Sequence, residues 1–357
     1  MTTEILKVGC EKTEYIIEKA RKILENGGLV AFPTETVYGL GGDALSADSS
    51  KKIYAAKGRP SDNPLIVHIG SPEQIPPLVK EIPEKAKALM DAFWPGPLTM
   101  ILKKSDAVPK ETTGGLETVA LRMPVHPFAL EFLKTIGMPV AAPSANLSGR
   151  PSTTKASHVV EDLNGRVDLI IDGGDVPIGV ESTIIDLTGE TPMLLRPGYI
   201  TVSELTAVIG PVKTDPAIEN ENLITHAIAI QNPKAPGMKY RHYAPKAELV
   251  IVSGEESEVI RAISEAATEN TGILTVSEHL NAFKTGKTVA CGSKENPDSI
   301  AHGLFAALRE FDALGVQKIY AEDFTESDIG TAVMNRLLKA AGGNFLSVAD
   351  FRKKEIG

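Results

Sequence analysis

The chain has 357 residues, of which 42% are hydrophobic and 23% charged, and its net charge is −9. This length favours two domains, and the balance is typical of a globular protein. The two cysteines stand far apart, which argues against a disulfide scaffold or a structural zinc site. No apolar run approaches the roughly 20 residues of a membrane span, and no secretory signal is visible, so we expect a soluble, cytoplasmic protein. The acidic balance argues against a dedicated nucleic-acid coat.

The first 209 residues mix helical and strand patterns. Apolar spacing predicts helices at Glu14–Asn26, Ala47–Ala56, Pro83–Phe93, Pro127–Ile136, Lys155–Leu163 and Ser203–Ile209. It predicts strands at Leu29–Phe32, Leu65–Ile69, Leu98–Leu102, Val119–Met123, Pro139–Ala142, Leu169–Asp172, Ser182–Leu187 and Met193–Arg196. We therefore expect residues 1–209 to form an α/β or α+β domain with helices packed on a mixed sheet.

The remaining chain divides at about residue 246. Residues 210–246 are rich in proline and weakly periodic, and they contain the cationic and aromatic string APGMKYRHYAP, so we expect an irregular linker or lid. Beyond it, strands alternate with helices, which favours a smaller, Rossmann-like parallel-sheet domain over residues 247–357. The expected strands are Leu249–Val252, Gly272–Val276, Thr288–Cys291 and Lys318–Ala321, and the helices are Glu256–Ala267, Asp298–Leu314 and Ile329–Ala341.

A glycine-rich string near residue 40 resembles a dinucleotide fingerprint. Gly39, Gly41 and Ala44 satisfy G-x-G-x-x-A, but that motif should follow a strand directly and open a helix. Here the strand is expected to stop at Pro33, and the five residues Thr34–Tyr38 lie between it and the first glycine. A nicotinamide oxidoreductase therefore remains only an alternative, and a P-loop is excluded because no GxxxxGK[ST] string exists.

Two groups of cationic residues are candidates for binding an anionic ligand. Lys57 and Arg59 flank a glycine at a predicted helix end, where they either satisfy the helix dipole or clamp a phosphate. The stiff, proline-rich setting of Asn63 and His68 favours a site, although a lone histidine on an apolar strand is more often a core residue. Arg122 lies on an alternating strand and needs an anionic partner, either a buried carboxylate or the carboxylate of an amino-acid ligand.

Polar loops follow several of the expected strands. The loop PTETVYGL offers hydroxyls and a carboxylate, and APSANLSG could cradle an anion or be an ordinary polar turn. Arg196 is a further cation, just before a turn. No Ser–His–Asp or Cys–His constellation stands out, so the pattern favours positioning and charge stabilisation over covalent catalysis.

Seven ordered strings together resemble the YrdC family: FPTETVYGLG, KGRPSDNPLIVHI, WPGPLT, TVALRMP, APSANLSG, GVESTIID and LLRPG. The APGMKYRHYAP string and the second domain resemble the family's long, two-domain form. This resemblance implies synthesis of L-threonylcarbamoyl-AMP and pyrophosphate from L-threonine, bicarbonate or CO₂, and ATP with Mg²⁺. The product is the donor for threonylcarbamoyl-adenosine in tRNA, so a downstream tRNA threonylcarbamoyl transferase is an implied partner. An RNA-binding module of the YrdC type is the alternative.

The resemblance also implies residue roles. Threonine would be held by Thr36, His68, Arg122, Ser182 and the backbone of Ala142. ATP would be held by Arg59, Asn63, Thr118, Ser144, Asn146, Ser152 and Arg196, with Tyr243 as a lid contact and Mg²⁺ carried mainly by ATP. Lys57 and Arg59 would stabilise the phosphoryl charge.

Overall fold

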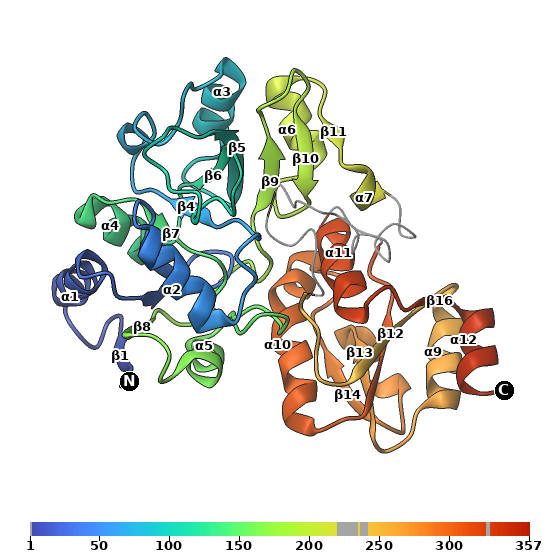
Figure 1. The fold of residues 1–357 in the computed structure, drawn as a ribbon. Helices are drawn as coiled ribbons and strands as arrows, with labels where there is room; N and C mark the ends of the chain where they lie inside the picture. Colours follow the sequence, from blue (N-terminus) through green and yellow to red (C-terminus); the bar gives the residue numbers. More distant parts are fainter. Residues whose placement is uncertain (1, 220–234, 236–241, 326–328) are drawn as a thin grey trace.

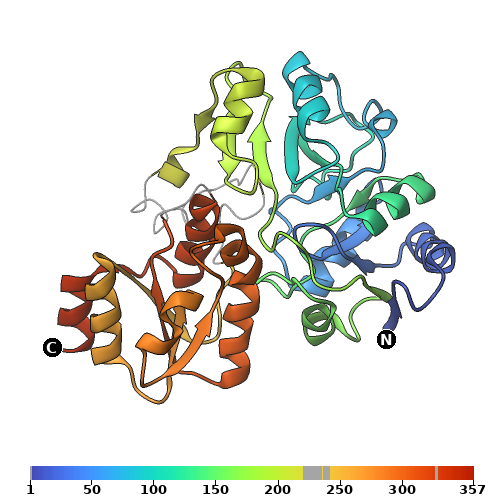
Figure 2. The ribbon, with the colours of Figure 1, turned by 180° about the vertical axis from the view of Figure 1, so that it is seen from behind.

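The protein forms two sheets in two adjoining lobes. In this computed structural model, residues 2–219, 235, 242–325 and 329–357 are described. The chain termini lie on opposite sides of the molecule, one at the outer edge of each lobe (Figures 1 and 2). No helix in these described ranges combines the length and the apolar character that crossing a bilayer requires.

The first lobe is built on a mixed sheet. Its strand order is β1-β8-β2-β3-β7-β4-β6-β5-β9-β10-β11, with parallel pairs such as β4·β6 and antiparallel pairs such as β5·β6. The strands are β1 Glu4–Lys7, β2 Val30–Phe32, β3 Gly39–Asp43, β4 Ile66–His68, β5 Leu98–Lys103, β6 Thr118–Arg122, β7 Val140–Ala141, β8 Leu169–Asp172, β9 Thr183–Asp186, β10 Met193–Arg196 and β11 Lys213–Thr214. The helices are α1 Thr13–Glu25, α2 Ala47–Lys57, η1 Pro72–Gln74, α3 Glu84–Phe93, α4 Pro127–Ile136, α5 Ala156–Leu163, α6 Val202–Ile209 and α7 Pro216–Glu219.

Helices cover both faces of this sheet. The apolar stripe of α1, including Ile16 and Ala20, packs with Phe132 of α4 against Phe32 of β2 and Ile171 of β8. These side chains are fully or almost fully buried, and burial of each large one contributes about 1.5–3 kcal/mol. The opposite face carries a larger core shared by α2, α3, α5 and α6. Both cores hold the strand ends in place, and those ends carry the polar residues described below.

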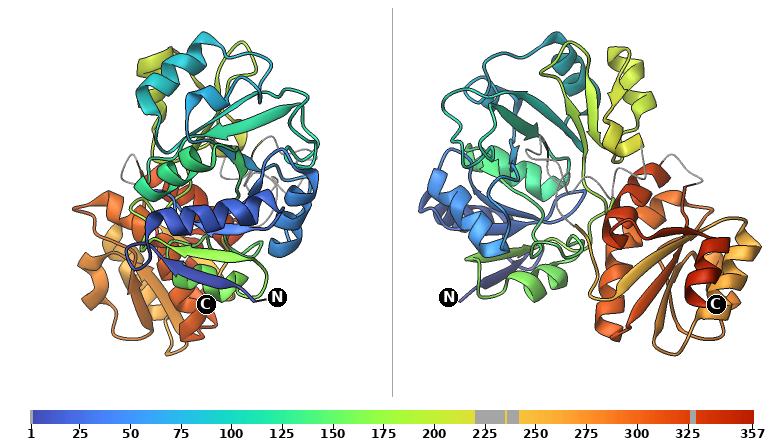
Figure 3. Two further views of the ribbon diagram at one scale, coloured as in Figure 1. Left: turned by 90° about the vertical axis from the view of Figure 1, so that its left-hand side faces the viewer. Right: turned by 45° about the vertical axis from the view of Figure 1, so that its right-hand side comes forward.

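The second lobe contains a five-stranded, entirely parallel sheet of order β14-β13-β15-β12-β16. Its strands are β12 Glu248–Ser253, β13 Thr271–Thr275, β14 Lys287–Ala290, β15 Lys318–Glu322 and β16 Phe345–Ser347; its helices are α9 Glu256–Ala266, η3 Ser277–Ala282, α10 Pro297–Leu314, α11 Gly330–Ala341 and α12 Val348–Glu355. Helices α9 and α12 cover one face, and α10 and α11 cover the other (Figures 1 and 3). Val250 and Val252 face the first pair, whereas Leu249 and Ile251 face the second. Burial on both faces explains the continuous apolar run of β12.

The expected fold class is therefore confirmed, with a mixed-sheet α/β part followed by a parallel Rossmann-like sheet. Two local features differ from expectation. The string from Gly39 to Asp43 forms β3, a strand that the sequence did not predict, and it does not open a helix, which agrees with the argument against dinucleotide binding there. A Cβ on Gly41 would lie 2.8 Å from Cγ1 of Val140, so close strand packing explains this glycine. The start of the expected irregular segment also contains β11 and α7.

The two lobes meet along α10. Arg309 of α10 bonds to Asp162 of α5, and Tyr243 packs on Phe305 with ring centroids 5.1 Å apart. The backbone also approaches closely at Gly179, whose φ is +88°. A Cβ at that position would lie 2.5 Å from the carbonyl oxygen of Ala301, so only glycine fits there.

Candidate active site

A polar cavity lies in the first lobe, where loops follow the ends of its strands and the segment after residue 241 closes one side. Parallel β4 and β6 pair His68 with Arg122 at their carboxyl ends, so both side chains reach the same edge. Arg196 ends β10, which lies beyond β5 and β9 in the same sheet. The cavity is lined by eleven residues that the sequence predicted for the site: Thr36, Lys57, Arg59, His68, Arg122, Ala142, Ser144, Asn146, Ser182, Arg196 and Tyr243.

Arg122 faces both a hydroxyl and a carboxylate. Its Nη1 donates to Thr36 Oγ1 at 2.8 Å, and its Nη2 lies 2.7 Å from Glu35 Oε1. Arg122 and Glu35 are 3% and 2% exposed, so this is a buried ion pair. Of the two partners that the sequence left open, the structure contains the buried carboxylate. Neither oxygen of Glu35 has a well-oriented hydrogen bond within the described residues, and neither does Nε of Arg122.

His68 is a neutral group at physiological pH. Burial, reinforced by the positive charge of Arg122, lowers its pKa to about 3. Its ring packs edge-on against Phe32, with centroids 6.2 Å apart, so it is both a core residue and a cavity residue. It can therefore offer a ligand a hydrogen bond but no charge.

Ser182 and Arg196 are joined by two hydrogen bonds. Arg196 donates from Nε to the Ser182 carbonyl at 3.0 Å and from Nη2 to the Ser182 hydroxyl at 3.1 Å. The Thr99 hydroxyl lies 2.7 Å from the same Ser182 oxygen. Burial lowers the pKa of Arg196 to about 10, so the guanidinium remains charged at pH 7. This arrangement fixes a cation and a hydroxyl in one orientation.

Lys57 braces the loop after β7. It is the last residue of α2, which ends where Gly58 adopts a left-handed conformation with φ of 61°. The Lys57 ammonium donates to the backbone carbonyls of Ser144 and Asn146. Burial, and then the charge of Arg59, lower the pKa of Lys57 well below its usual value. Arg59 itself bonds to the backbone carbonyls of Asn63 and Pro64 at 3.3 and 3.1 Å.

Three predicted nucleotide residues are not among the described residues that line the cavity. Asn63 is buried, and neither its side-chain oxygen nor its side-chain nitrogen has a hydrogen-bond partner among the described residues. Thr118 begins β6 and pairs with Lys103 of β5. Ser152 is fully buried and donates to Glu181 Oε1 at 2.6 Å. The predicted lid residues Lys239 and Arg241 lie outside the described residues.

Several cavity residues were not predicted as ligands. Glu181, Arg150 and His242 line the cavity. Glu35 is not among the described lining residues but forms the ion pair with Arg122. Glu181 and Glu35 stand inside strings that the sequence analysis quoted, but their roles depend on partners far along the chain. Glu181 bonds to Arg336 of α11, at 3.1 Å from Nε to Oε2. Burial opposes ionisation of Glu181, yet the charges of Arg336 and Arg196 outweigh it and lower the pKa of this carboxyl.

The cavity lining is predominantly cationic. Lys57, Arg59, Arg122, Arg150 and Arg196 face it, against the single carboxylate of Glu181 among the described lining residues. The described residues hold no cluster of three or more His, Cys, Asp or Glu side chains suited to a metal ion. The lining can therefore stabilise a polyanion such as a triphosphate, while Arg122 and Thr36 can bind a carboxylate.

Comparisons with known proteins agree over both lobes. Residues 22–198 match the family model described as Telomere recombination, and residues 200–342 match the one described as Threonylcarbamoyl-AMP synthase, C-terminal domain. The chain is 49% identical to the threonylcarbamoyl-AMP synthase of Bacillus subtilis (strain 168), over 92% of this chain and 94% of that protein. It is 48% identical to that of Pyrococcus abyssi, over 97% and 100%. The crystal structure of P. abyssi Sua5 complexed with L-threonine superimposes with a TM-score of 0.88 at 46% identity, covering 97% of this chain and 99% of that one. The chain therefore belongs to the YrdC/Sua5 family, in its long, two-domain threonylcarbamoyl-AMP synthase form.

Proposed function

We propose that this protein is a nucleotidyltransferase that converts L-threonine, bicarbonate or CO₂, and ATP into L-threonylcarbamoyl-AMP and pyrophosphate. The observation that carries the proposal is one cavity lined by two sets of anion-binding side chains. Arg122 and Thr36 are bonded to each other and form one set, and Lys57, Arg59 and Arg196 form the other. The names of the B. subtilis and P. abyssi relatives and the threonine complex of P. abyssi Sua5 support the choice of substrates.

Threonine would bind to the set that contains Arg122. Its carboxylate would accept hydrogen bonds from the Arg122 guanidinium, beside the hydroxyls of Thr36 and Ser182. His68, being uncharged, would offer a hydrogen bond without repelling the substrate amine. The backbone of Ala142 lies in the same lining. Because Glu35 already lies against Arg122, the substrate carboxylate would share this arginine with a protein carboxylate.

ATP would bind to the other set and the adjoining loop. We assign its contacts to Arg59, Ser144, Asn146 and Arg196 in the cavity, and to Tyr243 at its closing edge. Asn63, Thr118 and Ser152 belong to the same proposed set. Ser152 is buried and donates a hydrogen bond to Glu181, so a direct contact between Ser152 and ATP would require this bond to rearrange. The nucleotide enters as MgATP, with the ion held mainly by phosphate oxygens, as is usual for Mg²⁺.

The reaction needs positioning and charge stabilisation rather than a protein nucleophile. The amine of threonine captures CO₂ as a carbamate, whose oxygen attacks the α-phosphorus while pyrophosphate departs. Arg59 and Arg196 would stabilise the negative charge on the phosphoryl oxygens. Burial lowers the pKa of Lys57, and an adjacent phosphate would favour its charged form. Lys57 would also keep Ser144 and Asn146 in place through their carbonyls.

The product is a mixed anhydride that water would destroy. We propose that residues 210–246 act as a linker and lid between a catalytic domain of residues 1–209 and a C-terminal domain of residues 247–357. Tyr243 supports this role, because it is 6% exposed, lines the cavity and packs on Phe305 of the second lobe. Exclusion of water would preserve the product until a tRNA threonylcarbamoyl transferase receives it.

Pyrophosphate release tests the proposal directly. Release should require threonine, bicarbonate, ATP and Mg²⁺ together. When the threonine is isotopically labelled, the label should appear in the nucleotide product. Equal release without threonine would leave a plain ATP pyrophosphatase and would refute the assignment.

A further inference from the structure

Helix α10 of the second lobe presents one stripe of residues to the first lobe and to the segment that contains Tyr243 and Lys246. Phe305, Arg309 and Asp312 are spaced by four and three residues, so they share a face of the helix. Phe305 packs on Tyr243, and Asp312 Oδ1 accepts a bond from the Lys246 backbone at 2.7 Å. Between them, Arg309 reaches across to α5 of the first lobe. One helix face therefore meets both the closing segment and the catalytic lobe.

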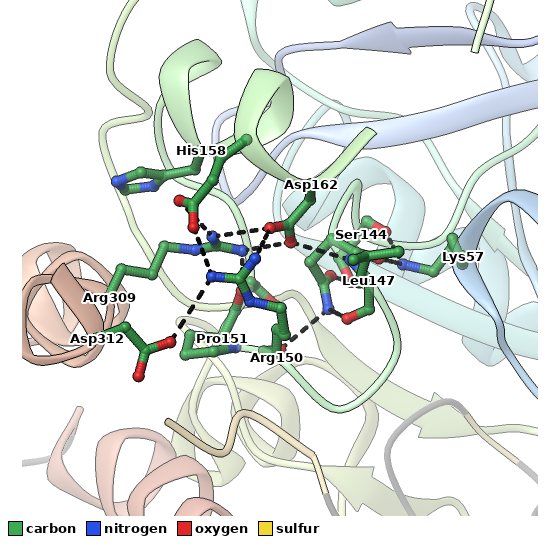
Figure 4. Close-up of polar contacts among 12 residues, drawn as sticks. Lys57, Ser144, Leu147, Arg150, Pro151, His158, Asp162, Arg309 and Asp312 are labelled. Atoms are coloured by element: carbon green, nitrogen blue, oxygen red, sulfur yellow. Dashed lines mark hydrogen bonds and ion pairs between the residues drawn. The ribbon is translucent and has the colours of Figure 1, made fainter. Parts of the chain in front are cut away.

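Arg309 forms a forked contact with Asp162. Its Nη2 donates to Asp162 Oδ2 at 2.8 Å, and its Nη1 donates to Oδ1 at 3.2 Å. The same Nη2 donates to the Pro151 carbonyl at 2.6 Å. Arg309 and Asp162 are 5% and 3% exposed, so water competes little for these bonds. Figure 4 shows Arg309 pointing away from α10 into this cluster.

Asp162 in turn holds the loop that follows β7. Its Oδ2 accepts the Leu147 backbone N–H at 3.0 Å, and its Oδ1 pairs with Arg150 Nη1. Asn146, in the same loop, donates to the carbonyls of Leu147 and Arg150 at 2.8 and 3.0 Å. Lys57 closes the network from the far side through Ser144 and Asn146 (Figure 4). Asp162 is thus shared between an arginine of the second lobe and the loop that carries the proposed nucleotide ligands.

We infer that Arg309 is a positioning residue for ATP: through Asp162 it holds the loop of residues 144–152 in its binding geometry. Arg309 does not line the cavity, so it acts through its partners. This inference rests on the proposed function for the identity of the ligand. It assigns a specific task to the second lobe, namely fixing one wall of a cavity built by the first. Arg336 differs from Arg309, because it bonds to Glu181, which accepts from Ser152 at the end of this loop, and it does not bond to Asp162 within the described residues.

The test compares three full-length variants. Arg309→Met keeps the length of the side chain but removes the fork, and Arg309→Lys keeps the charge with a single point of contact. Arg352→Met is the matched control, because Arg352 pairs with Glu258 and Glu265 inside the second lobe, at 3.1 and 3.3 Å. Initial rates give KM for ATP and for threonine. Calorimetry with an ATP analogue that has a methylene bridge between the α and β phosphates gives a Kd that needs no turnover.

We expect Arg309→Met to raise both KM for ATP and Kd for the analogue roughly tenfold to hundredfold, as for a displaced positioning group. For Arg309→Lys, both KM for ATP and Kd for the analogue should lie between the values for Arg309→Met and for wild type. KM for threonine should change by less than about twofold in both, and Arg352→Met should leave all three constants within about twofold. If Arg309 had a purely structural role, its replacement would instead lower the folded fraction and kcat, without a selective loss of ATP and analogue binding.

A folded Arg309→Met protein with wild-type Kd for the analogue would overturn the inference, as would an equal loss of ATP and threonine binding. If Arg309→Met fails to fold, Arg309→Lys decides, and a wild-type Kd in that variant overturns the inference. If wild type releases no threonine-dependent pyrophosphate but the Arg309 variants still weaken analogue binding, the proposed reaction fails and the positioning role stands.

Discussion

Replacement of Arg122 by alanine should damage both the stability of the fold and the binding of threonine, and the structure allows the two effects to be separated. Arg122 and Glu35 form an ion pair with atoms 2.7 Å apart, and both residues are almost fully buried. Removing the guanidinium leaves the buried Glu35 carboxylate without its ion-pair partner, which lowers the free energy of unfolding by about 3–5 kcal/mol. That is a large share of the roughly 5–15 kcal/mol that stabilises a typical protein domain.

The second effect concerns the substrate carboxylate. Loss of a charge-assisted hydrogen bond costs about 1.5–3 kcal/mol, which corresponds to a rise in KM for threonine of roughly tenfold to hundredfold. KM for ATP should change little, because the proposed ATP contacts do not include Arg122 or Thr36.

The double variant Arg122→Ala with Glu35→Gln distinguishes the two costs. A neutral buried amide that lacks a partner costs about 1–3 kcal/mol, so the double variant should be roughly 2 kcal/mol more stable than Arg122→Ala. Urea unfolding at pH 7 measures this difference, and initial rates with saturating ATP measure KM for threonine. KM for threonine should stay raised in both the single and the double variant. Recovery of the wild-type KM in the double variant would show that Arg122 does not bind threonine and that the stranded carboxylate had distorted the site.

Three further outcomes follow from the cavity. Arg59→Ala should reduce kcat/KM by about 2–4 kcal/mol of transition-state stabilisation, measured by pyrophosphate release, and a loss under tenfold would contradict a catalytic role. Tyr243→Ala should weaken ATP-analogue binding in calorimetry and leave threonine binding unchanged; unaltered analogue binding would remove Tyr243 from the nucleotide site. His68 has a pKa of about 3 in the folded protein, against about 6.5 in the unfolded chain. Its contribution to the free energy of unfolding is therefore complete above pH 6.5. That contribution falls by up to about 1.4 kcal/mol per pH unit as the pH drops towards 3. Urea unfolding between pH 4 and 7 should show a shallower pH dependence for His68→Gln than for wild type, and identical slopes would mean that His68 titrates normally in the folded protein.

The elements with clear apolar periodicity could be predicted from sequence nearly to the residue. Helix α4 and strands β8 and β10 have the predicted bounds, because proline and the apolar spacing mark their limits locally. Strand β3 escaped prediction because GLGGD has the composition of a turn, and only packing against neighbouring strands makes it extended. Helix α12 was also missed, since Phe351 is its single buried residue and the rest of its sequence is mostly charged.

The site shows the same division between local and long-range information. The cations and hydroxyls of the cavity were visible because each stands in a short string with turn residues or a strand end. Their partners were not visible: Glu35 meets Arg122 across 87 residues, and Glu181 meets Arg336 across 155. Such pairs depend on how strands and lobes come together, and a single sequence contains no local signal for them. The place of Ser152 behind Glu181, instead of in the cavity lining, is a tertiary outcome of the same kind.

Gly179 shows how a residue without a side chain can imitate an active-site residue in a mutational scan. Its N–H donates to the carbonyl of Thr36 at 3.1 Å, and its Cα faces the α10 backbone with no space for a methyl group. Any substitution must push apart the loop that carries Thr36 and the helix that bears Arg309. Scored by growth or turnover, such a variant would rank beside those of Arg59 or Arg122, although Gly179 is not among the described residues that line the cavity. Ranking residues by loss of activity would therefore overstate the size of the catalytic machinery, unless folding and ligand binding are measured alongside.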